Sequence, residues 1–214
     1  MAAKKLKPAP GGRQAAYSAR NRAALIKAAQ EVLAEIGPSA TIEQLAAHAQ
    51  VSPTTIYKYF ENKEVLFLEA IAEIWNAWLT WANGFRAPGD RLERTLDSGR
   101  TLFWAKKTHP FFADILHNVL AADPNILVKS DQGVAKVVFR ELAASGIIKN
   151  DNFDQRFILW TNIYSGILCS IFVTKDLTPA EAELAFGIGL SVWGISEAKA
   201  KKIISRPLEL APVK

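Results

Sequence analysis

Apolar residues recur along most of this chain at the spacing of an α-helix. Between Leu25 and Ile36 they stand three or four positions apart, which places them on one face of a helix. Gly37 and Pro38 then end the segment, so a helix is predicted at residues 17–36. Some short apolar runs also suit a strand, but segment length and prolines in first-turn positions favour helices. The result is a predicted all-α protein, with further helices at residues 42–49, 54–59, 63–82, 90–108, 110–121, 124–145, 152–174 and 179–204.

Two very short predicted helices follow one another between residues 41 and 66. Thr41 followed by Gln44 matches a capping box, in which each residue bonds the backbone N–H of the other at the start of a helix. Ser52 is a second N-cap residue, and Pro53 occupies the first helical position, where proline is tolerated. Two short helices joined by a tight turn are typical of the helix-turn-helix, which places its second helix in the major groove of DNA.

A distinctive order of residues runs through this stretch: Thr41, Ile42, Leu45, Ala46, Ala49, Val51, Ser52, Thr55, Tyr57, Tyr59, Phe60, Lys63 and Leu66. That order, with the run YKYFENKEVL inside it, resembles the TetR family of bacterial transcriptional regulators. One difference is Gln50 in the turn, where the family usually has glycine. A left-handed Gln50 would cost on the order of 1 kcal/mol.

The resemblance implies how the chain is divided. An N-terminal three-helix helix-turn-helix DNA-binding head would occupy residues 16–62, joined to a helical ligand-binding and dimerisation body at residues 63–205. A disordered basic tail (1–15) and an irregular tail (206–214) would flank them. It also implies a homodimer on a near-palindromic DNA operator, and an apolar or aromatic small-molecule effector that tilts the helix linking head and body and releases the DNA.

The predicted DNA-contacting residues are Arg20, Thr41, Ser52, Thr54, Thr55, Tyr57, Lys58, Tyr59 and Lys63. On the second short helix, Thr54, Thr55 and Lys58 fall on the solvent side and can reach base edges. The resemblance implies that Tyr57 contacts a phosphate, while Lys63 begins a helix whose N-terminal amides can hold another. Alternatively, Tyr57 or Tyr59 packs inside the head and leaves only its hydroxyl exposed.

The positive charge of the chain is concentrated in the same region. Residues 1–63 hold nine Lys or Arg and four Asp or Glu, which accounts for the whole net charge of +5, because the remaining 17 basic and 17 acidic residues cancel. A basic head on a neutral body is the distribution expected of a DNA-binding protein. The lysines of the first seven residues also suit a solubilising tail.

The predicted body is rich in aromatic side chains. Most of them belong to the core in any protein, but as a set they suit a large, mostly apolar pocket between helices. His117, Asn118, Asn162 and Tyr164 are candidate polar groups within it. The predicted ligand-binding residues are Trp75, Trp78, Phe103, Trp104, Phe112, His117, Phe139, Trp160 and Tyr164.

The last two predicted helices place small residues among large apolar ones, so that two helices can approach closely. They are the predicted dimer interface, in which two copies would form a four-helix bundle. The alternative is that the same faces pack within one protomer. The small residues are Ser165, Gly166, Cys169, Ser170, Ala182, Ala185, Gly187 and Gly189.

Composition excludes several classes of protein. No apolar run approaches the ~20 residues of a membrane span, the N-terminus lacks the apolar stretch of a secretory signal, and one cysteine, Cys169, fits a reducing cytoplasm. The three histidines have no nucleophile in a recognised setting, and Asp114 with His117 lacks a third metal ligand at suitable spacing. No enzyme, metal or cofactor is therefore expected. A helical small-molecule carrier and an architectural DNA-binding protein remain the alternatives to a ligand-responsive repressor.

Overall fold

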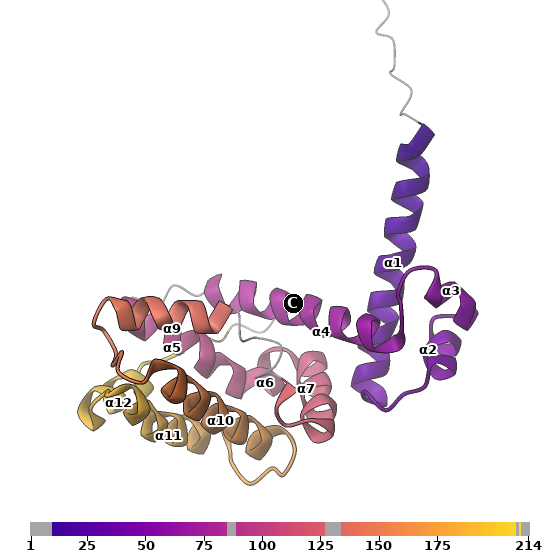
Figure 1. Ribbon diagram of the computed structural model, residues 1–214. Coiled ribbons are helices and arrows are strands. Elements are labelled where there is room, and N and C mark those ends of the chain that lie inside the picture. The colour runs from indigo at the N-terminus through magenta and orange to yellow at the C-terminus, as the bar shows by residue number, and fades with distance from the viewer. Residues whose placement is uncertain (1–9, 85–88, 127–133, 209, 211–214) are drawn as a thin grey trace, which may run out of the picture.

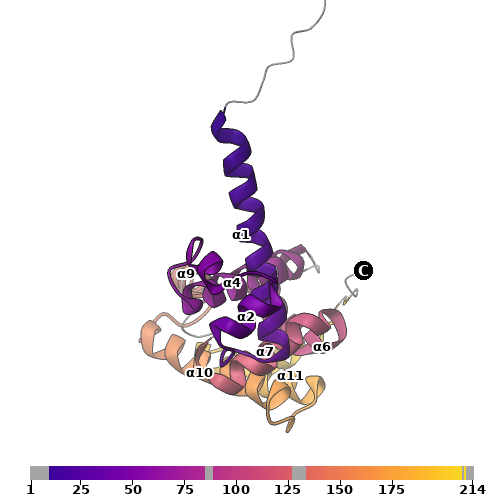
Figure 2. The ribbon, with the colours of Figure 1, turned by 90° about the vertical axis from the view of Figure 1, so that its right-hand side faces the viewer.

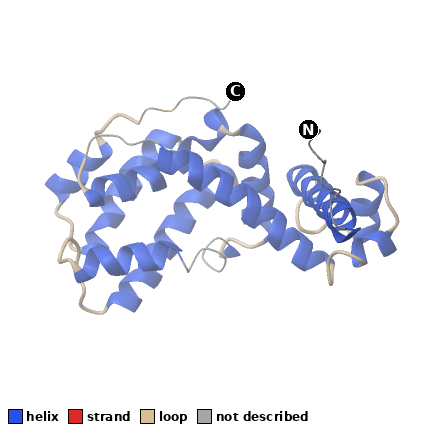
Figure 3. Ribbon diagram, turned by 90° about the horizontal axis from the view of Figure 1, so that it is seen from above, coloured by secondary structure: helices blue, strands red, loops and turns tan. Residues whose placement is uncertain are grey.

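The structure is a computed structural model that describes residues 10–84, 89–126 and 134–208 together with Leu210. All regular structure in these residues is helical, which confirms the predicted all-α fold. A head containing α1, α2 and α3 is joined by α4 to a larger body (Figure 1), and the two lie at opposite ends of the molecule when seen from above (Figure 3). None of the helices in the described residues is long and apolar enough to cross a membrane.

The elements follow the chain in a simple order. They are α1 (Pro10–Glu35), α2 (Ile42–His48), α3 (Pro53–Tyr57), α4 (Lys63–Gly84), α5 (Arg91–Thr101), η1 (Leu102–Trp104), α6 (Ala105–Thr108), α7 (Pro110–Ala122), α9 (Val134–Ala144), α10 (Phe153–Phe172), α11 (Pro179–Gly189), η2 (Leu190–Trp193) and α12 (Glu197–Ile204).

Two hydrophobic cores lie along α4. Its first half packs with α1, α2 and α3 around side chains such as Leu45, Ile56 and Leu66, which are completely buried. Its second half, from Trp78 onward, packs with the helices of the body. Because α4 contributes to both cores, a tilt of this helix would move the head relative to the body.

The core of the head also receives residues from α7. Ile115 and Val119 are almost fully buried in it. Between them, the side-chain amide of Asn118 donates hydrogen bonds to the carbonyl oxygens of Leu33 (3.0 Å) and Ala34 (2.7 Å), which lie in the last turn of α1. The packing of the chain therefore does not divide at the predicted boundary between residues 62 and 63.

The two short helices begin as predicted. Thr41 and Gln44 form a complete capping box at the start of α2, and Ser52 accepts a hydrogen bond from the backbone N–H of Thr55 at the start of α3. Gln50 in the intervening turn has φ = 54°, so the turn is left-handed at a residue other than glycine. The helix-turn-helix is thus built from side-chain caps close in sequence.

The first helix is longer than predicted. It begins at Pro10 rather than near Tyr17, so residues 10–15 of the predicted disordered tail are helical, while residues 1–9 lie outside the described residues. Proline is favourable in the first turn, and the following Gln14-Ala15-Ala16 has high helix propensity. This part of α1 projects from the head, and residues 14–20 are all exposed (Figures 1 and 2).

Two long helices of the body were predicted as single segments, and this was wrong. Residues 90–108 divide into α5, η1 and α6, and residues 179–204 divide into α11, η2 and α12. In the second case Gly194 is left-handed (φ = 74°), which ends the helical path, and Ser196 then caps α12. Part of the predicted helix at residues 124–145 lies outside the described residues.

Candidate functional site

The outer face of α3 is polar and exposed. Thr54, Tyr57 and Lys58 all reach solvent, and the side chain of Tyr57 is 52% exposed. On the opposite face Ile56 and Phe60 are buried in the head, as predicted. Since α2 and α3 lie at the end of the molecule farthest from the body (Figure 1), this face is open to a long, straight partner.

Hydroxyl groups at the start of α2 and α3 serve the helix backbone. Thr41 Oγ1 accepts from the N–H of Gln44 at 3.2 Å, and Ser52 Oγ accepts from the N–H of Thr55 at 3.2 Å. The hydroxyls of Ser52 and Thr55 also bond each other at 2.9 Å, and Thr55 is only half-exposed. Of the two threonines on α3, Thr54 is therefore the more accessible.

The two tyrosines predicted to contact DNA lie in different environments. Tyr59 is half-buried, and its hydroxyl accepts a hydrogen bond of 3.0 Å from the side-chain amide of Asn21 on α1. The alternative in which the ring packs in the head thus describes Tyr59. Tyr57 stays exposed and is the better candidate for a phosphate contact.

Lys63 and Arg20 also differ. The Lys63 ammonium donates to the carbonyl oxygens of Ala40 (2.8 Å) and Pro38 (3.3 Å) and so holds the turn before α2. Its role as a phosphate ligand stays a prediction. Arg20, on the projecting part of α1, is exposed.

Asn21 and Arg22 of α1 fix the end of α3, although neither is among the predicted DNA-contacting residues. Arg22 on α1 pairs with Glu69 on α4, and its guanidinium lies 4.7 Å from the centre of the Phe60 ring. Together with Asn21, it places α1 against the residues that follow α3. No local pattern signals these contacts, because the partners stand 38 and 47 residues apart.

The predicted ligand-binding aromatics form two clusters inside the body. Trp75 and Trp78 of α4 pack on Phe112 of α7, with ring centres 5.2 to 6.0 Å apart. The second cluster lies between η1, α9, α10, α11 and η2, and its members are Phe103, Phe139, Trp160 and Tyr164 with Phe186 and Trp193. The structure therefore does not bring all of the predicted residues together around one space.

Several predicted polar groups are bonded to the protein itself. His117 Nδ1 lies 2.6 Å from the carbonyl oxygen of Phe172 at the end of α10. The Tyr164 hydroxyl donates to the carbonyl oxygen of Gly99 at 2.8 Å. By contrast, within the described residues the buried indole N–H groups of Trp75 and Trp78 have no hydrogen-bond acceptor.

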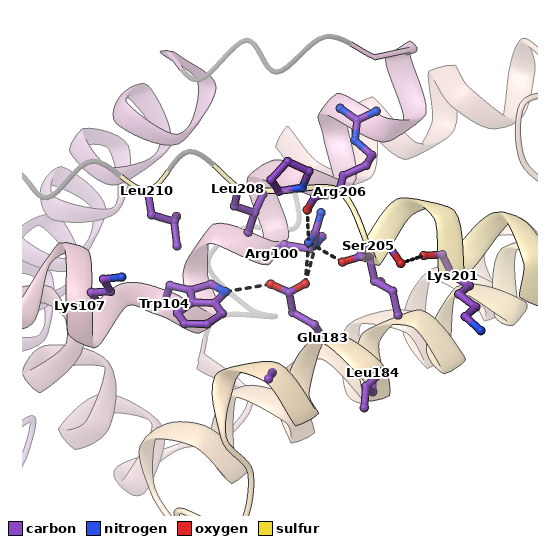
Figure 4. Close-up of a pocket in the computed structure, with 13 residues that line it drawn as sticks. Arg100, Trp104, Lys107, Glu183, Leu184, Lys201, Ser205, Arg206, Leu208 and Leu210 are labelled. Carbon is purple, nitrogen blue, oxygen red and sulfur yellow. Dashed lines mark hydrogen bonds and ion pairs between the residues drawn. The ribbon is translucent and has the colours of Figure 1, made fainter.

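A pocket of about 600 Å³ opens where α6, α11 and α12 meet the C-terminal segment (Figure 4). Trp104 is the only predicted ligand-binding residue that lines it. Beneath it, Arg100 is almost fully buried and donates to Asp97 at 2.9 Å and to Glu183 at 2.5 Å. Burial raises the pKa of Asp97 above its usual value, although Arg206 and Arg100 act in the opposite direction.

The head carries the features of a known family. Residues 25–70 match the model of the bacterial regulatory proteins, tetR family. Over these residues the chain carries the N-terminal DNA-binding domain of the TetR family. The match covers the second half of α1, all of α2 and α3 and the start of α4, which is the region where the caps, the left-handed turn and the exposed face of α3 lie. The TetR family consists of transcriptional regulators and not of enzymes, in agreement with the sequence-based expectation.

Other comparisons extend this result to the fold. The HTH-type transcriptional regulator RutR of Escherichia coli K12 is 35% identical over 77 residues, which are 36% of this chain and 36% of that protein. A crystal structure of RolR in complex with resorcinol has a TM-score of 0.69 at 20% identity and covers 92% of this chain and 100% of its own. A TetR-family regulator from Haemophilus influenzae RD has a TM-score of 0.53 at 15% identity, with 81% and 96% covered. The chain thus matches about a third of the length of the curated relatives. The solved structures share its helical fold.

Proposed function

We propose that this protein is a homodimeric transcriptional repressor of the TetR family that leaves a near-palindromic operator when a small molecule binds its body. The observation that carries the proposal is the outer face of α3. Thr54, Tyr57 and Lys58 are exposed there, while Ile56 anchors the same helix in the core of the head. A helix so oriented can enter the major groove, where a hydroxyl and an ammonium can bond base edges and phosphates.

Two further features support DNA binding. Residues 1–63, which include the head, hold the entire net positive charge of the chain. In addition, Arg20 lies next to Asn21, whose amide bonds Tyr59 just after α3. The exposed part of α1 therefore begins beside the DNA-reading helix, from where Arg20 can reach a flanking phosphate.

A dimer is supported by the outer faces of α10 and α11, which pack side by side. Ile158 and Leu159 on α10 are 59% and 52% exposed, and Ile188 on α11 is 76% exposed. Apolar side chains exposed on two adjacent helices are typical of a surface that a partner covers. A second copy would bury them in a four-helix bundle and set the two heads on successive half-sites.

A ligand-responsive body is supported by the two indole N–H groups on α4. Trp75 and Trp78 lie on the helix that carries the head, and a ligand with hydrogen-bond acceptors would satisfy their buried donors. The structural neighbour RolR was solved with resorcinol, and a small aromatic hydroxyl compound is a suitable class to test first. To change DNA affinity by two decades, the ligand must bind the released state more tightly by ~2.8 kcal/mol.

The first test is the fluorescence anisotropy of labelled DNA from the region upstream of this protein's own gene, measured across a salt series. We expect tight binding with two subunits per site and a steep loss of affinity with salt. Lys58→Ala should weaken binding and reduce the salt slope by about 1. Tyr57→Phe should weaken binding without altering the slope, and Lys199→Ala on α12 is a control that should change neither.

Three results distinguish the alternatives. The lack of measurable binding to both upstream and random DNA, even at low salt, would favour the carrier. Sequence-independent binding that no small aromatic compound reverses would favour the architectural protein. If a compound does reverse DNA binding, Asn118→Ala should weaken the compound's effect on DNA affinity more than it weakens binding of the compound to the protein. The reason is that Asn118 joins α7 to α1.

A further inference from the structure

The pocket at the C-terminal end of the body is separate from the Trp75–Trp78 pair and from the head. We refer to it as the C-terminal pocket. Apolar side chains form two of its sides. Leu208 and Leu210 of the C-terminal segment lie across from Leu184 of α11, and the Trp104 ring closes one end (Figure 4). A volume of about 600 Å³ with such walls accommodates a small organic molecule.

The floor of the C-terminal pocket is polar, but its charges are balanced within the protein. Glu183 accepts from Arg100 through one carboxylate oxygen and from the indole N–H of Trp104 through the other, at 2.5 and 2.8 Å. The same Arg100 guanidinium also donates to the backbone carbonyls of Ile203 and Ile204. The donors of Arg100 are thus committed to the protein and leave little attraction for a charged ligand.

The rim differs from the floor. Lys107 on α6 lines the pocket, and its ammonium points toward Trp104 and Leu210 (Figure 4). Its side chain is exposed, and no acid among the described residues pairs with it. Lys201 also lines the pocket, but its side chain points away from the centre. The pocket therefore combines apolar walls with one available cation at the end formed by Trp104.

We propose that the C-terminal pocket binds a small organic anion with an apolar chain, such as a medium-chain carboxylate. The anionic group lies at the Lys107 ammonium. The chain lies against Trp104 and between Leu184 and Leu208. This site does not depend on DNA binding, because its residues contact neither α3 nor the core of the head.

The test uses the full-length protein and three eight-carbon compounds that differ in charge. Octanoate, octan-1-ol and protonated octylamine each compete with the fluorescent dye 8-anilinonaphthalene-1-sulfonate at neutral pH. We expect octanoate to displace the dye at the lowest concentration and octylamine at the highest. An ion pair at a solvent-exposed rim should give octanoate an advantage of about three- to fivefold over octan-1-ol.

Matched variants locate the effect. Lys107→Gln should abolish the advantage of octanoate, whereas Lys106→Gln, at the adjacent position of α6 and outside the lining, should preserve it. Leu208→Ser should weaken all three compounds, because it removes part of the apolar wall. Thermal unfolding by circular dichroism should be the same for both lysine variants. An equal loss in both, or no preference for octanoate in the unaltered protein, would overturn the proposal.

Discussion

The head and the body are both helical, but among the described residues the buried charged side chains all lie in the body. In the head, the caps of α2 and α3 join residues three apart in sequence, Thr41 with Gln44 and Ser52 with Thr55. In the body, Arg100 joins Glu183 across 83 residues. Short-range bonds form from local sequence alone, whereas long-range bonds need the tertiary fold first. A motif built on short-range bonds can therefore be recognised in the sequence of the head, whereas the long-range contacts of the body become visible only in the fold.

The largest effect should come from the long-range network of the body. Arg100→Ala leaves the buried carboxylate of Glu183 without its cation, and the free energy of unfolding should fall by about 3–5 kcal/mol. Chemical denaturation measures it. The control is Arg91→Ala, on the same helix as Arg100. It removes an exposed ion pair with Glu141 of α9 and should lower the free energy of unfolding by less than about 1 kcal/mol. Similar losses in the two variants would mean that burial of the network contributes nothing.

The core of the head should give the next largest effect. Ile56→Ala removes a fully buried side chain from α3 and should cost about 2–5 kcal/mol. Thr54→Ala, on the exposed face of the same helix, should change the unfolding free energy by less than about 0.5 kcal/mol. A head that melts separately from the body in the Ile56 variant would show that the two cores unfold independently.

Removal of one N-cap in each region tests whether N-cap hydrogen bonds stabilise the head and the body equally. Ser52→Ala in the head and Thr178→Ala in the body each remove a hydroxyl that accepts from the backbone N–H three residues later. Each should cost about 1 kcal/mol. Thermal unfolding of the two variants, measured side by side, checks this. A large loss in only one region would show that the local bond there also supports tertiary contacts.

The smallest effect is expected in the turn of the head. Gln50→Gly relieves a left-handed side chain but increases the freedom of the unfolded chain, and the two effects are similar in size. The melting temperature should stay the same or rise slightly, and the free energy of unfolding should change by less than about 0.5 kcal/mol. A marked loss of stability would mean that the Gln50 side chain makes contacts that glycine cannot replace.

The sequence allowed the head to be predicted in more detail than the body. Thr41, Ser52 and Pro53 are local start signals, and the inward positions of Ile56 and Phe60 follow from helical spacing. The long helix predicted at residues 179–204 is interrupted at Gly194, whose left-handed backbone (φ = 74°) ends the helical path. This conformation of Gly194 becomes evident only in the folded chain, where Lys149 donates its N–H to the carbonyl of Trp193.

The residues of the candidate sites, too, were predictable only where the local sequence determines their environment. Exposure of Tyr57 on α3 was predictable from periodicity, but the hydrogen bond between Asn21 and Tyr59 depends on how α1 crosses the head. Aromatic residues identified the interior of the body, yet whether Trp104 lines a pocket and Phe103 a core depends on which helices meet there. Composition indicates the kind of surface, and tertiary packing determines its location.

The insertion of α7 into the head limits how this protein can be recombined. A chimera that keeps α1 to α4 and takes its body from a relative would lose Ile115 and Val119 from the core and the two carbonyl contacts of Asn118. The body therefore cannot be exchanged by a cut after α4 alone. A transplant that also carries the surface of α7, from Ile115 to Val119, would keep the core of the head intact while the other helices of the body are replaced.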